Sequence, residues 1–174
     1  MAFISISITK NHPLILGKGG FGRQLADWLS AEGWGEAEFL DDSAPGCVGG
    51  LRDYADPKLL KPGRPAFVAL GDNALRVELL QKLAAAGYDT PVFISDMAAV
   101  SPRAVVEPGC VILPQAYVGA DAHLGVGCIV NGGAIVDHDA VLGRGVHVAP
   151  GGIVKAGAEV EALTKVDSGE IIKK

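Results

Sequence analysis

A six-residue repeat in the C-terminal half of the chain restricts its fold more than any other feature of the sequence. An aliphatic residue recurs at every sixth position, without interruption. The recurring residues are Val100, Val106, Ile112, Val118, Leu124, Val130, Val136, Leu142, Val148, Val154, Val160 and Val166. Most residues four positions later are small, as at Ala116 and Ala134. One inward aliphatic side chain per six residues, followed by a small corner residue, predicts a parallel β-helix with three flat sides per turn.

The number of repeats sets the size of this column, because three sides make one coil. Twelve recurring positions predict about four coils. A column this short needs covered ends, and its apolar outer sides favour assembly with further copies. We expect the N-terminal part of the chain to cover one end and the tail 168–174 to cover the other. The prismatic shape is typical of a homotrimer around one axis.

The first half of the chain alternates short apolar runs with amphipathic stretches. We predict strands at 13–16, 38–40, 66–70 and 91–94. Helices are expected after the first and third of these strands, the second one ending at a Gly87 cap. Strand–helix alternation of this kind predicts a small parallel sheet covered by helices. The expected domains are therefore an α/β domain over 1–96 and a β-helix domain over 97–174.

Composition excludes several classes of function. The net charge of -5 and the pI near 5.3 argue against nucleic-acid binding or a polybasic membrane patch, because both need clustered cations. Cys47, Cys110 and Cys128 lack CxxC spacing and are interpreted as reduced thiols, without a zinc site. The N-terminus has no basic region before its short apolar run, and no apolar stretch has membrane-spanning length. We expect a soluble cytoplasmic protein.

A glycine-rich loop, GKGGFG at 17–22, lies between the first predicted strand and its helix. Backbone N–H groups at a helix N-terminus attract phosphate, which makes this context suggestive. Asp41 and Asp42 follow the second strand, where dinucleotide folds bind ribose hydroxyls. Residues 71–73 and Arg76 follow the third strand at the same sheet edge. The loop is interpreted as a nucleotide or nucleotide-sugar pocket, with a tight turn that binds no ligand as the alternative.

Two histidines of the repeat region are candidates for chemistry. His138, between Asp137 and Asp139, points outward from the column by its position in the repeat. An imidazole titrates near neutral pH, and an adjacent carboxylate fixes its tautomer and raises its basicity. His147, nine residues later, is expected on the next side, facing a ligand or a neighbouring subunit. The alternative is that both are surface or interface residues. His123 lacks an acidic neighbour at the matching position and is interpreted as structural.

Four segments of the chain together resemble one enzyme family. They are LILGKGGFGRQLADWL from Leu14, FLDD from Phe39, FVALGDNALR from Phe67, and NGGAIVDHDAVLGRGVHVAPG from Asn131. The family is that of bacterial hexapeptide-repeat sugar acetyltransferases, typified by UDP-4-amino-sugar N-acetyltransferases of the bacillosamine and perosamine pathways and by sialic acid O-acetyltransferases. The resemblance extends from Leu14 to about Ala158, and the last segment carries both histidines at the family's spacing.

The resemblance implies a fold, a co-substrate and a set of site residues. The fold is a Rossmann-like domain that binds a nucleotide-linked amino sugar, followed by a left-handed β-helix that forms homotrimers. His138 would be the general base and Asp139 its supporting carboxylate. The implied acetyl-CoA contacts are His147, Asn131 at the subunit cleft, and backbone near Ala156 and Gly157. The implied sugar-nucleotide contacts are Gly19, Gly20, Phe21, Asp41, Asp42, Gly71 and Asn73.

The implied reaction is direct transfer of the acetyl group from acetyl-CoA to the sugar amine, without a metal, in surface polysaccharide or glycan biosynthesis. Two departures from the family pattern stand out. Phe21 occupies a position that is commonly His or another polar residue. The segment from Glu161 resembles the family's end, whereas relatives continue for further coils beyond the match to Ala156, coils that help hold the CoA adenosine.

Other functions fit parts of the same pattern. O-acetylation of a sugar hydroxyl uses the same residues. A shortened, weakly catalytic homologue that binds a sugar nucleotide or serves as an assembly module would differ by lacking CoA affinity. A zinc-dependent hydratase would require interface histidines on a metal, and metal analysis would detect it. NAD-dependent reduction would be detected by titration with a nicotinamide cofactor.

Overall fold

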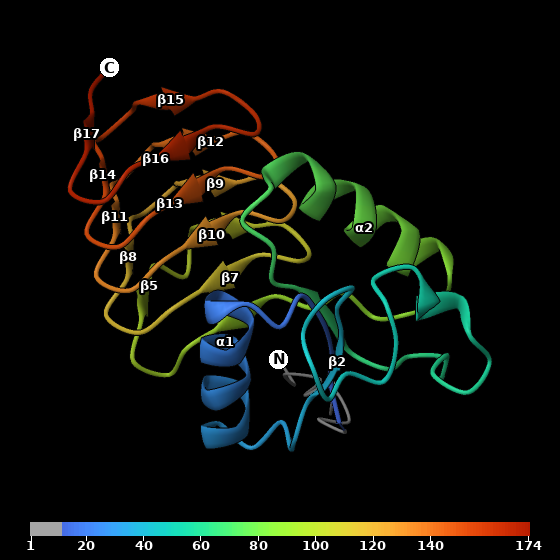
Figure 1. The fold of residues 1–174 in the computed structure, drawn as a ribbon. Helices are drawn as coiled ribbons and strands as arrows, with labels where there is room; N and C mark the ends of the chain where they lie inside the picture. Colours follow the sequence, from blue (N-terminus) through green and yellow to red (C-terminus); the bar gives the residue numbers. More distant parts are fainter. Residues whose placement is uncertain (1–11) are drawn as a thin grey trace, which may run out of the picture.

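The computed structural model describes residues 12–174, which form a small α/β unit beside a tall β-helix (Figure 1). Residues 1–11, which include the segment expected to carry no export signal, lie outside the described residues. Within the described part of the chain, no helix is long and apolar enough to cross a membrane.

The N-terminal unit is built around a parallel sheet of three strands in the order β2-β1-β3. The strands are β1 (Leu14–Leu16), β2 (Glu38–Leu40) and β3 (Ala66–Val68), with α1 (Gly20–Ala31) after β1, a 3-10 turn η1 (Asp53–Ala55) between β2 and β3, and α2 (Asn73–Ala85) after β3. Leu14, Ile15 and Leu16 are fully buried, because helices cover the sheet and leave no polar face. The three strands and two helices confirm the predicted alternation.

The fourth expected strand does not join this sheet. β4 (Phe93–Ile94) pairs in parallel with a β-helix strand, Phe93 lying opposite Val111. The six-residue period explains the difference, because Ile94 lies six residues before Val100. The repeat therefore begins one side earlier than the sequence analysis placed it.

The β-helix has three faces, each a parallel sheet. The first face contains β4, β7, β10, β13 and β16, the second β5, β8, β11, β14 and β17, and the third β6, β9, β12 and β15. The strands of the first face after β4 are β7 (Val111–Ile112), β10 (Ile129–Val130), β13 (His147–Val148) and β16 (Lys165–Val166). Those of the second are β5 (Ala99–Val100), β8 (Tyr117–Val118), β11 (Ile135–Val136), β14 (Ile153–Val154) and β17 (Ile171–Ile172). Those of the third are β6 (Val105–Val106), β9 (His123–Leu124), β12 (Val141–Leu142) and β15 (Glu159–Val160).

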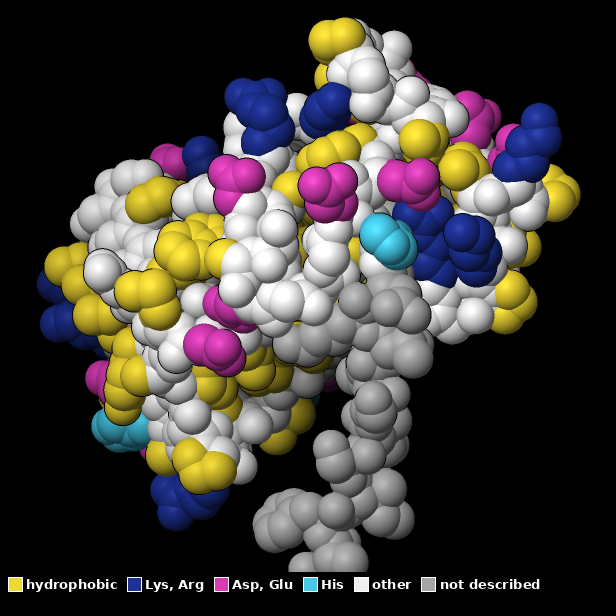
Figure 2. Space-filling model, turned by 90° about the horizontal axis from the view of Figure 1, so that it is seen from below, with side chains coloured by type: hydrophobic (Ala, Val, Ile, Leu, Met, Phe, Trp, Pro, Cys, Tyr) yellow, Lys and Arg dark blue, Asp and Glu magenta, His cyan; other side chains and the backbone are white. Residues whose placement is uncertain are grey.

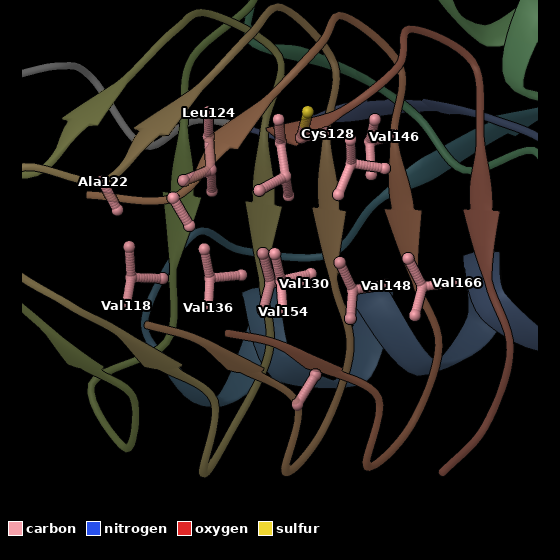
Figure 3. Packing of buried hydrophobic residues seen from close by; sticks show 14 of the residues in the cluster. Val118, Ala122, Leu124, Cys128, Val130, Val136, Val146, Val148, Val154 and Val166 are labelled. Carbon is pink, nitrogen blue, oxygen red and sulfur yellow. The ribbon is translucent and has the colours of Figure 1, made fainter. Parts of the chain in front are cut away.

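The interior of the column consists of the predicted aliphatic residues. Val118, Val130, Val136 and Val148 are fully buried and point into the same interior (Figure 3). Each fully buried aliphatic side chain of this size contributes about 1.5–3 kcal/mol relative to an exposed one. The expected parallel β-helix of about four coils is therefore confirmed.

The two ends of the column differ from expectation. The α/β unit packs against the first face, where Phe93, Val111 and Ile129 contact residues of α1 and the sheet. It does not cover the end, because Val100 and Val106 of the first coil remain only partly buried. The tail expected to cover the other end instead adds strand β17 to the second face.

The second and third faces carry apolar side chains toward the outside. Tyr117, Ile135 and Ile171 are exposed on the second face, and Val105 and Val141 on the third. Several hydrophobic side chains also reach the surface in the view from below (Figure 2). Contiguous exposed apolar surface of this kind favours assembly.

Glycines that follow inward aliphatic residues let successive coils approach closely. A Cβ on Gly143 would lie 2.5 Å from the backbone N of Ala162 in the next coil. We expect Gly143→Ala to lower the free energy of unfolding by about 1–3 kcal/mol, because the backbone of a coil has to shift. Gly132→Ala is the matched control, since the nearest described atom to its Cβ would be Pro114 O at 3.5 Å. Denaturant unfolding that shows equal stability losses for the two variants would contradict this account.

Candidate active site

The glycine-rich loop connects β1 to α1 and is tightly packed at both ends. Gly17 has φ +99, and a Cβ on Gly22 would lie 1.9 Å from Gly17 O. Between them, a Cβ on Gly19 or Gly20 would meet no atom of the described residues within 4 Å. Gly19 is the N-cap of α1 and supplies no capping side chain. No side chain therefore covers Gly19 and Gly20 at the N-terminus of α1, so a phosphate could approach the unpaired N–H groups of the first turn.

The two aspartates after β2 hold backbone N–H groups in this loop and in the segment that follows β2. The Asp41 carboxylate accepts hydrogen bonds from the backbone N–H groups of Lys18, Ser43 and Ala44, at 2.8–2.9 Å. These bonds, the one from Lys18 first, lower the pKa of Asp41 to about 2. Asp42 Oδ1 accepts from Leu51 N at 2.8 Å. Asp41 therefore fixes the backbone of the glycine-rich loop at Lys18, and Asp42 fixes the segment after β2 at Leu51, roles that sequence reasoning did not assign to them.

The loop after β3 borders the same sheet edge. A Cβ on Gly71 would meet no described atom within 4 Å, so this position is open. Asp72 caps α2 by accepting from Leu75 N at 2.9 Å. Asn73 is less available than expected, because its Nδ2 donates to Leu163 O of the β-helix at 2.8 Å and its Oδ1 is buried.

His147 lies on β13 of the first face and faces the α/β unit. Its ring centroid is 6.3 Å from that of Phe21 in α1. Both ring nitrogens are buried, and neither has a hydrogen-bond partner within residues 12–174. Burial, together with the positive charges of Arg76 and Lys165, lowers the pKa of His147 to about 4. The ring is therefore a neutral imidazole with unsatisfied hydrogen-bonding capacity.

His138 lies in the turn between β11 and β12, at the corner between the second and third faces. Its side chain is 58% exposed, and its Nδ1 is 2.6 Å from Asp139 Oδ2. This hydrogen bond, followed by the charge of Asp137, raises the pKa of His138. The pairing leaves Nε2 free toward solvent, so the expected outward position is confirmed. An exposed imidazole oriented by a carboxylate can act as a general base.

Two further candidates stack directly on this histidine. Ala156 and Gly157 occupy the same corner one coil later, and Gly157 N donates to His138 O at 3.0 Å. Asn131, by contrast, follows β10 at a different corner and is 8% exposed. Its Oδ1 accepts from Gly132 N at 2.8 Å. The structure thus separates Asn131 from the candidate base within one chain.

The candidate residues form two groups. The corner group comprises His138, Asp139, Ala156 and Gly157, and the loop group comprises Gly19, Gly20, Phe21, Gly71 and His147. The loop group lies against the first face, whereas the corner group lies at the edge of the prism opposite that face. One chain therefore does not bring the two groups together.

Sequence reasoning missed two features of the site region. His123, which seemed to lack an acidic partner, has its Nε2 2.7 Å from Glu107 Oε1. Glu107 directly follows β6, one coil before His123 on β9. Only the stacking of the two coils brings the pair together. The second feature is the burial of Arg76: the sequence placed this residue beside the loop pocket, but its side chain is fully buried between α2 and the β-helix. No group of three or more potential metal ligands occurs within residues 12–174.

Comparison with known proteins identifies relatives of both halves. The family model of the PglD N-terminal domain matches residues 14–83. The solved acetyltransferase domain of PglB from Neisseria gonorrhoeae is 29% identical, with a TM-score of 0.81 over 94% of this chain and 91% of that chain. Its complex with acetyl coenzyme A gives 33% identity and a TM-score of 0.76, over 94% and 87% of the two chains. No curated protein sequence matches the chain.

A third solved structure is that of PerB from Caulobacter crescentus in complex with CoA and GDP-perosamine. It is 28% identical, with a TM-score of 0.77 over 94% of this chain and 89% of that chain. The likeness thus spans the α/β unit and the β-helix together.

The pKa values of the two histidines are expected to be shifted in opposite directions from the ordinary value of 6.5. NMR should show the His147 ring titrating near pH 4 and the His138 ring above pH 6.5. Because unfolded His147 binds protons below pH 6.5 and the folded ring does not, stability is complete above that pH and decreases toward pH 4. His147→Gln should therefore reduce the loss of unfolding temperature on acidification. A His147 signal that titrates above pH 6 would contradict the burial argument.

Proposed function

The chain belongs to the hexapeptide-repeat sugar acetyltransferases, and we propose that it acetylates the amino group of a nucleotide-linked amino sugar with His138 as general base. As a member of that family it is an acyltransferase with acetyl-CoA as co-substrate. The observation that supports this role of His138 best is its 2.6 Å contact with Asp139 on an exposed corner. We propose surface polysaccharide or glycan biosynthesis as the setting.

The proposed mechanism is direct transfer. Asp139 holds Nδ1–H of His138, so that the lone pair of Nε2 points outward. The sugar amine attacks the thioester carbonyl, His138 takes the proton that the amine loses, and a C–N bond forms. Collapse of the tetrahedral intermediate breaks the C–S bond, and the proton passes from His138 to the departing CoA thiolate. General-base assistance of this kind contributes about 10²–10⁴ in rate.

The two halves of the chain are proposed to bind different substrates. In residues 1–96, the open N-terminus of α1 at Gly19 and Gly20 suits the diphosphate of a nucleotide sugar, and Gly71 suits close approach of the same ligand. Asp41 supports this pocket by fixing the backbone at Lys18, and Asp42 holds the neighbouring segment at Leu51. In residues 97–174, the Ala156–Gly157 corner next to His138 suits the pantetheine arm of acetyl-CoA.

The proposed set of contacts also includes Phe21, Asn73, Asn131 and His147. Phe21 supplies an apolar ring where relatives commonly have a polar residue, so it packs on the substrate instead of donating a hydrogen bond. Neutral His147 is suited to donate to an uncharged acceptor such as the thioester carbonyl. Asn73 contacts ligand only through backbone, because its amide is bound to Leu163 O.

Assembly is proposed to complete the site. The corner group of one chain lies opposite its own loop group, and the second and third faces beside His138 carry exposed Tyr117, Ile135 and Val141. In a homotrimer these faces would pack together, and the corner group of one subunit would meet the loop group of the next. PerB, with bound CoA and GDP-perosamine, is a relative in which both ligands are present together.

An acetyl-transfer assay over UDP-, GDP- and dTDP-linked amino sugars tests the function. We expect product with at least one of them, and a kcat lower by about 10²–10⁴ for His138→Ala. His123→Ala is the matched control, because His123 also pairs with a carboxylate, at 2.7 Å, and should retain the wild-type kcat. Unchanged turnover in His138→Ala would overturn the role of His138 as general base. Acetylation of sugar hydroxyl groups only would overturn the proposal that the amine is the acceptor.

Mixing two inactive variants tests whether the site lies between subunits. His138→Ala lacks the base, and Gly20→Trp blocks the loop. If both groups must come from neighbouring chains, co-expressed mixed trimers regain activity at about a quarter of their sites, because that share pairs an intact base with an intact loop. Sedimentation should give three times the 17.9 kDa chain mass. A monomer, or mixtures without activity, would exclude the shared site.

A further inference from the structure

The N-terminal half of α2 is fastened to one corner of the β-helix over three consecutive coils. Gly127, Gly145 and Leu163 occupy equivalent positions at the corner between the third and first faces, and all three have φ between +65 and +69. Arg76 Nε donates to Gly127 O at 2.9 Å and Arg76 Nη2 to Gly145 O at 2.7 Å. Asn73 Nδ2 donates to Leu163 O at 2.8 Å. We call Arg76 and Asn73 the α2 clasp.

Side-chain packing makes the same contact specific. A Cβ on Gly127 would lie 2.6 Å from Leu80 Cδ1, and one on Gly145 would lie 2.7 Å from Val77 Cγ2. At the two levels where Leu80 and Val77 approach the column, the corner residues are thus glycines. The corner and α2 therefore fit each other closely along the length of the clasp.

The clasp also holds the loop that follows β3. Arg76 Nη1 donates to Leu70 O at 2.8 Å, and Leu70 directly precedes the open Gly71. One guanidinium thus joins the proposed sugar-nucleotide loop to two coils of the column. A planar group with several fixed donors can hold three carbonyl oxygens in one geometry, which a lysine ammonium on a flexible stem does less well.

This joint is costly to build. Arg76 is fully buried, and burial lowers its pKa to about 10. Within residues 12–174, its hydrogen bonds all go to neutral carbonyls, those of Leu70, Gly127 and Gly145. A buried cation without a carboxylate hydrogen-bonded to it costs stability relative to an apolar side chain of similar volume. Such a residue is most easily understood if its geometry serves the reaction.

The clasp lies beside the first face at His147. Three elements face that imidazole: α2 through Arg76, β16 through Lys165, and α1 through the uncharged ring of Phe21. Gly145, whose carbonyl Arg76 holds, is two residues before His147. The same side chain therefore fixes the main chain next to His147 and the loop at Gly71.

We propose that Arg76, assisted by Asn73, is a positioning residue that sets the sugar-nucleotide loop against the β-helix, so that the bound amine reaches the thioester in the reactive geometry. This inference rests on the proposed function, because it assigns the relative placement of the two substrates to the clasp. The substrates keep their separate pockets without the clasp, and what is lost is their alignment.

Arg76→Lys tests the proposal, because it keeps the charge and loses the three-way geometry. We expect kcat to fall about 10²-fold while the KM for acetyl-CoA and for the sugar nucleotide each change less than about threefold, since misplacement of reactants by about 1 Å has such an effect. Asn73→Ala, which removes only the bond to Leu163 O, should lower kcat less, and it serves as the test if Arg76→Lys does not fold.

Arg64→Lys is the matched control. Arg64 is also buried, and it bonds Glu38, His12 O and Leu59 O at the opposite end of the small sheet. We expect it to lose stability and to retain kcat. If both lysine variants lower kcat in proportion to the folded fraction, Arg76 is merely structural and the proposal is overturned. The same holds if Arg76→Lys keeps the wild-type kcat.

Hydrogen exchange gives a readout that does not need the reaction. The amides of Gly127 and Gly145, bonded to Pro108 O and Val126 O, should exchange faster in Arg76→Lys and unchanged in Arg64→Lys. Unchanged exchange in Arg76→Lys overturns the positioning role. A wild-type protein that acetylates none of the sugars, yet shows this exchange pattern, would overturn the proposed function and leave the joint itself supported.

Discussion

Stacking of aliphatic side chains inside the β-helix is the interaction on which the rest of the structure depends. Each coil buries its inward residues against those of the coils above and below, as Val118, Val136 and Val154 do along one face. The parallel ladders keep these residues in register, so a corner position recurs at the same place in every coil. Functional groups can therefore be built by stacking, and the contact between Gly157 N and His138 O is an example.

The same regularity gives the α/β unit a place to dock. Because corner residues recur once per coil, a straight helix laid along a corner meets an equivalent carbonyl at each level, and α2 binds three of them through Arg76 and Asn73. The glycines at these levels let α2 approach closely. The docking covers the first face and leaves the corner with His138 exposed. This division is the reason why the proposed site needs two subunits, since His138 and the glycine-rich loop lie on opposite sides of the β-helix within one chain.

In the candidate site, features that depend on local spacing were predicted correctly, whereas contacts between coils were not. The sequence correctly indicated an outward His138 with a carboxylate beside it, because both depend on local spacing within one coil. It interpreted His123 as structural but did not indicate its partner Glu107, which comes from the preceding coil. The resemblance implied Asp41 and Asn73 as ligand contacts, and the structure adds that their side chains are hydrogen-bonded to loop N–H groups and to Leu163 O. Such partners lie far along the chain and leave no local signal.

The β-helix could be predicted from the amino-acid pattern, because one aliphatic residue at every sixth position has few other ways to be buried. The alternation of strands and helices before the repeat could be predicted in the same way. Three features became visible only in the folded molecule: β4 belongs to the column, the α/β unit covers a side instead of an end, and Arg76 joins the two parts. Those outcomes depend on which surfaces meet in space, and contact between distant segments is not encoded in the spacing of residues along either one.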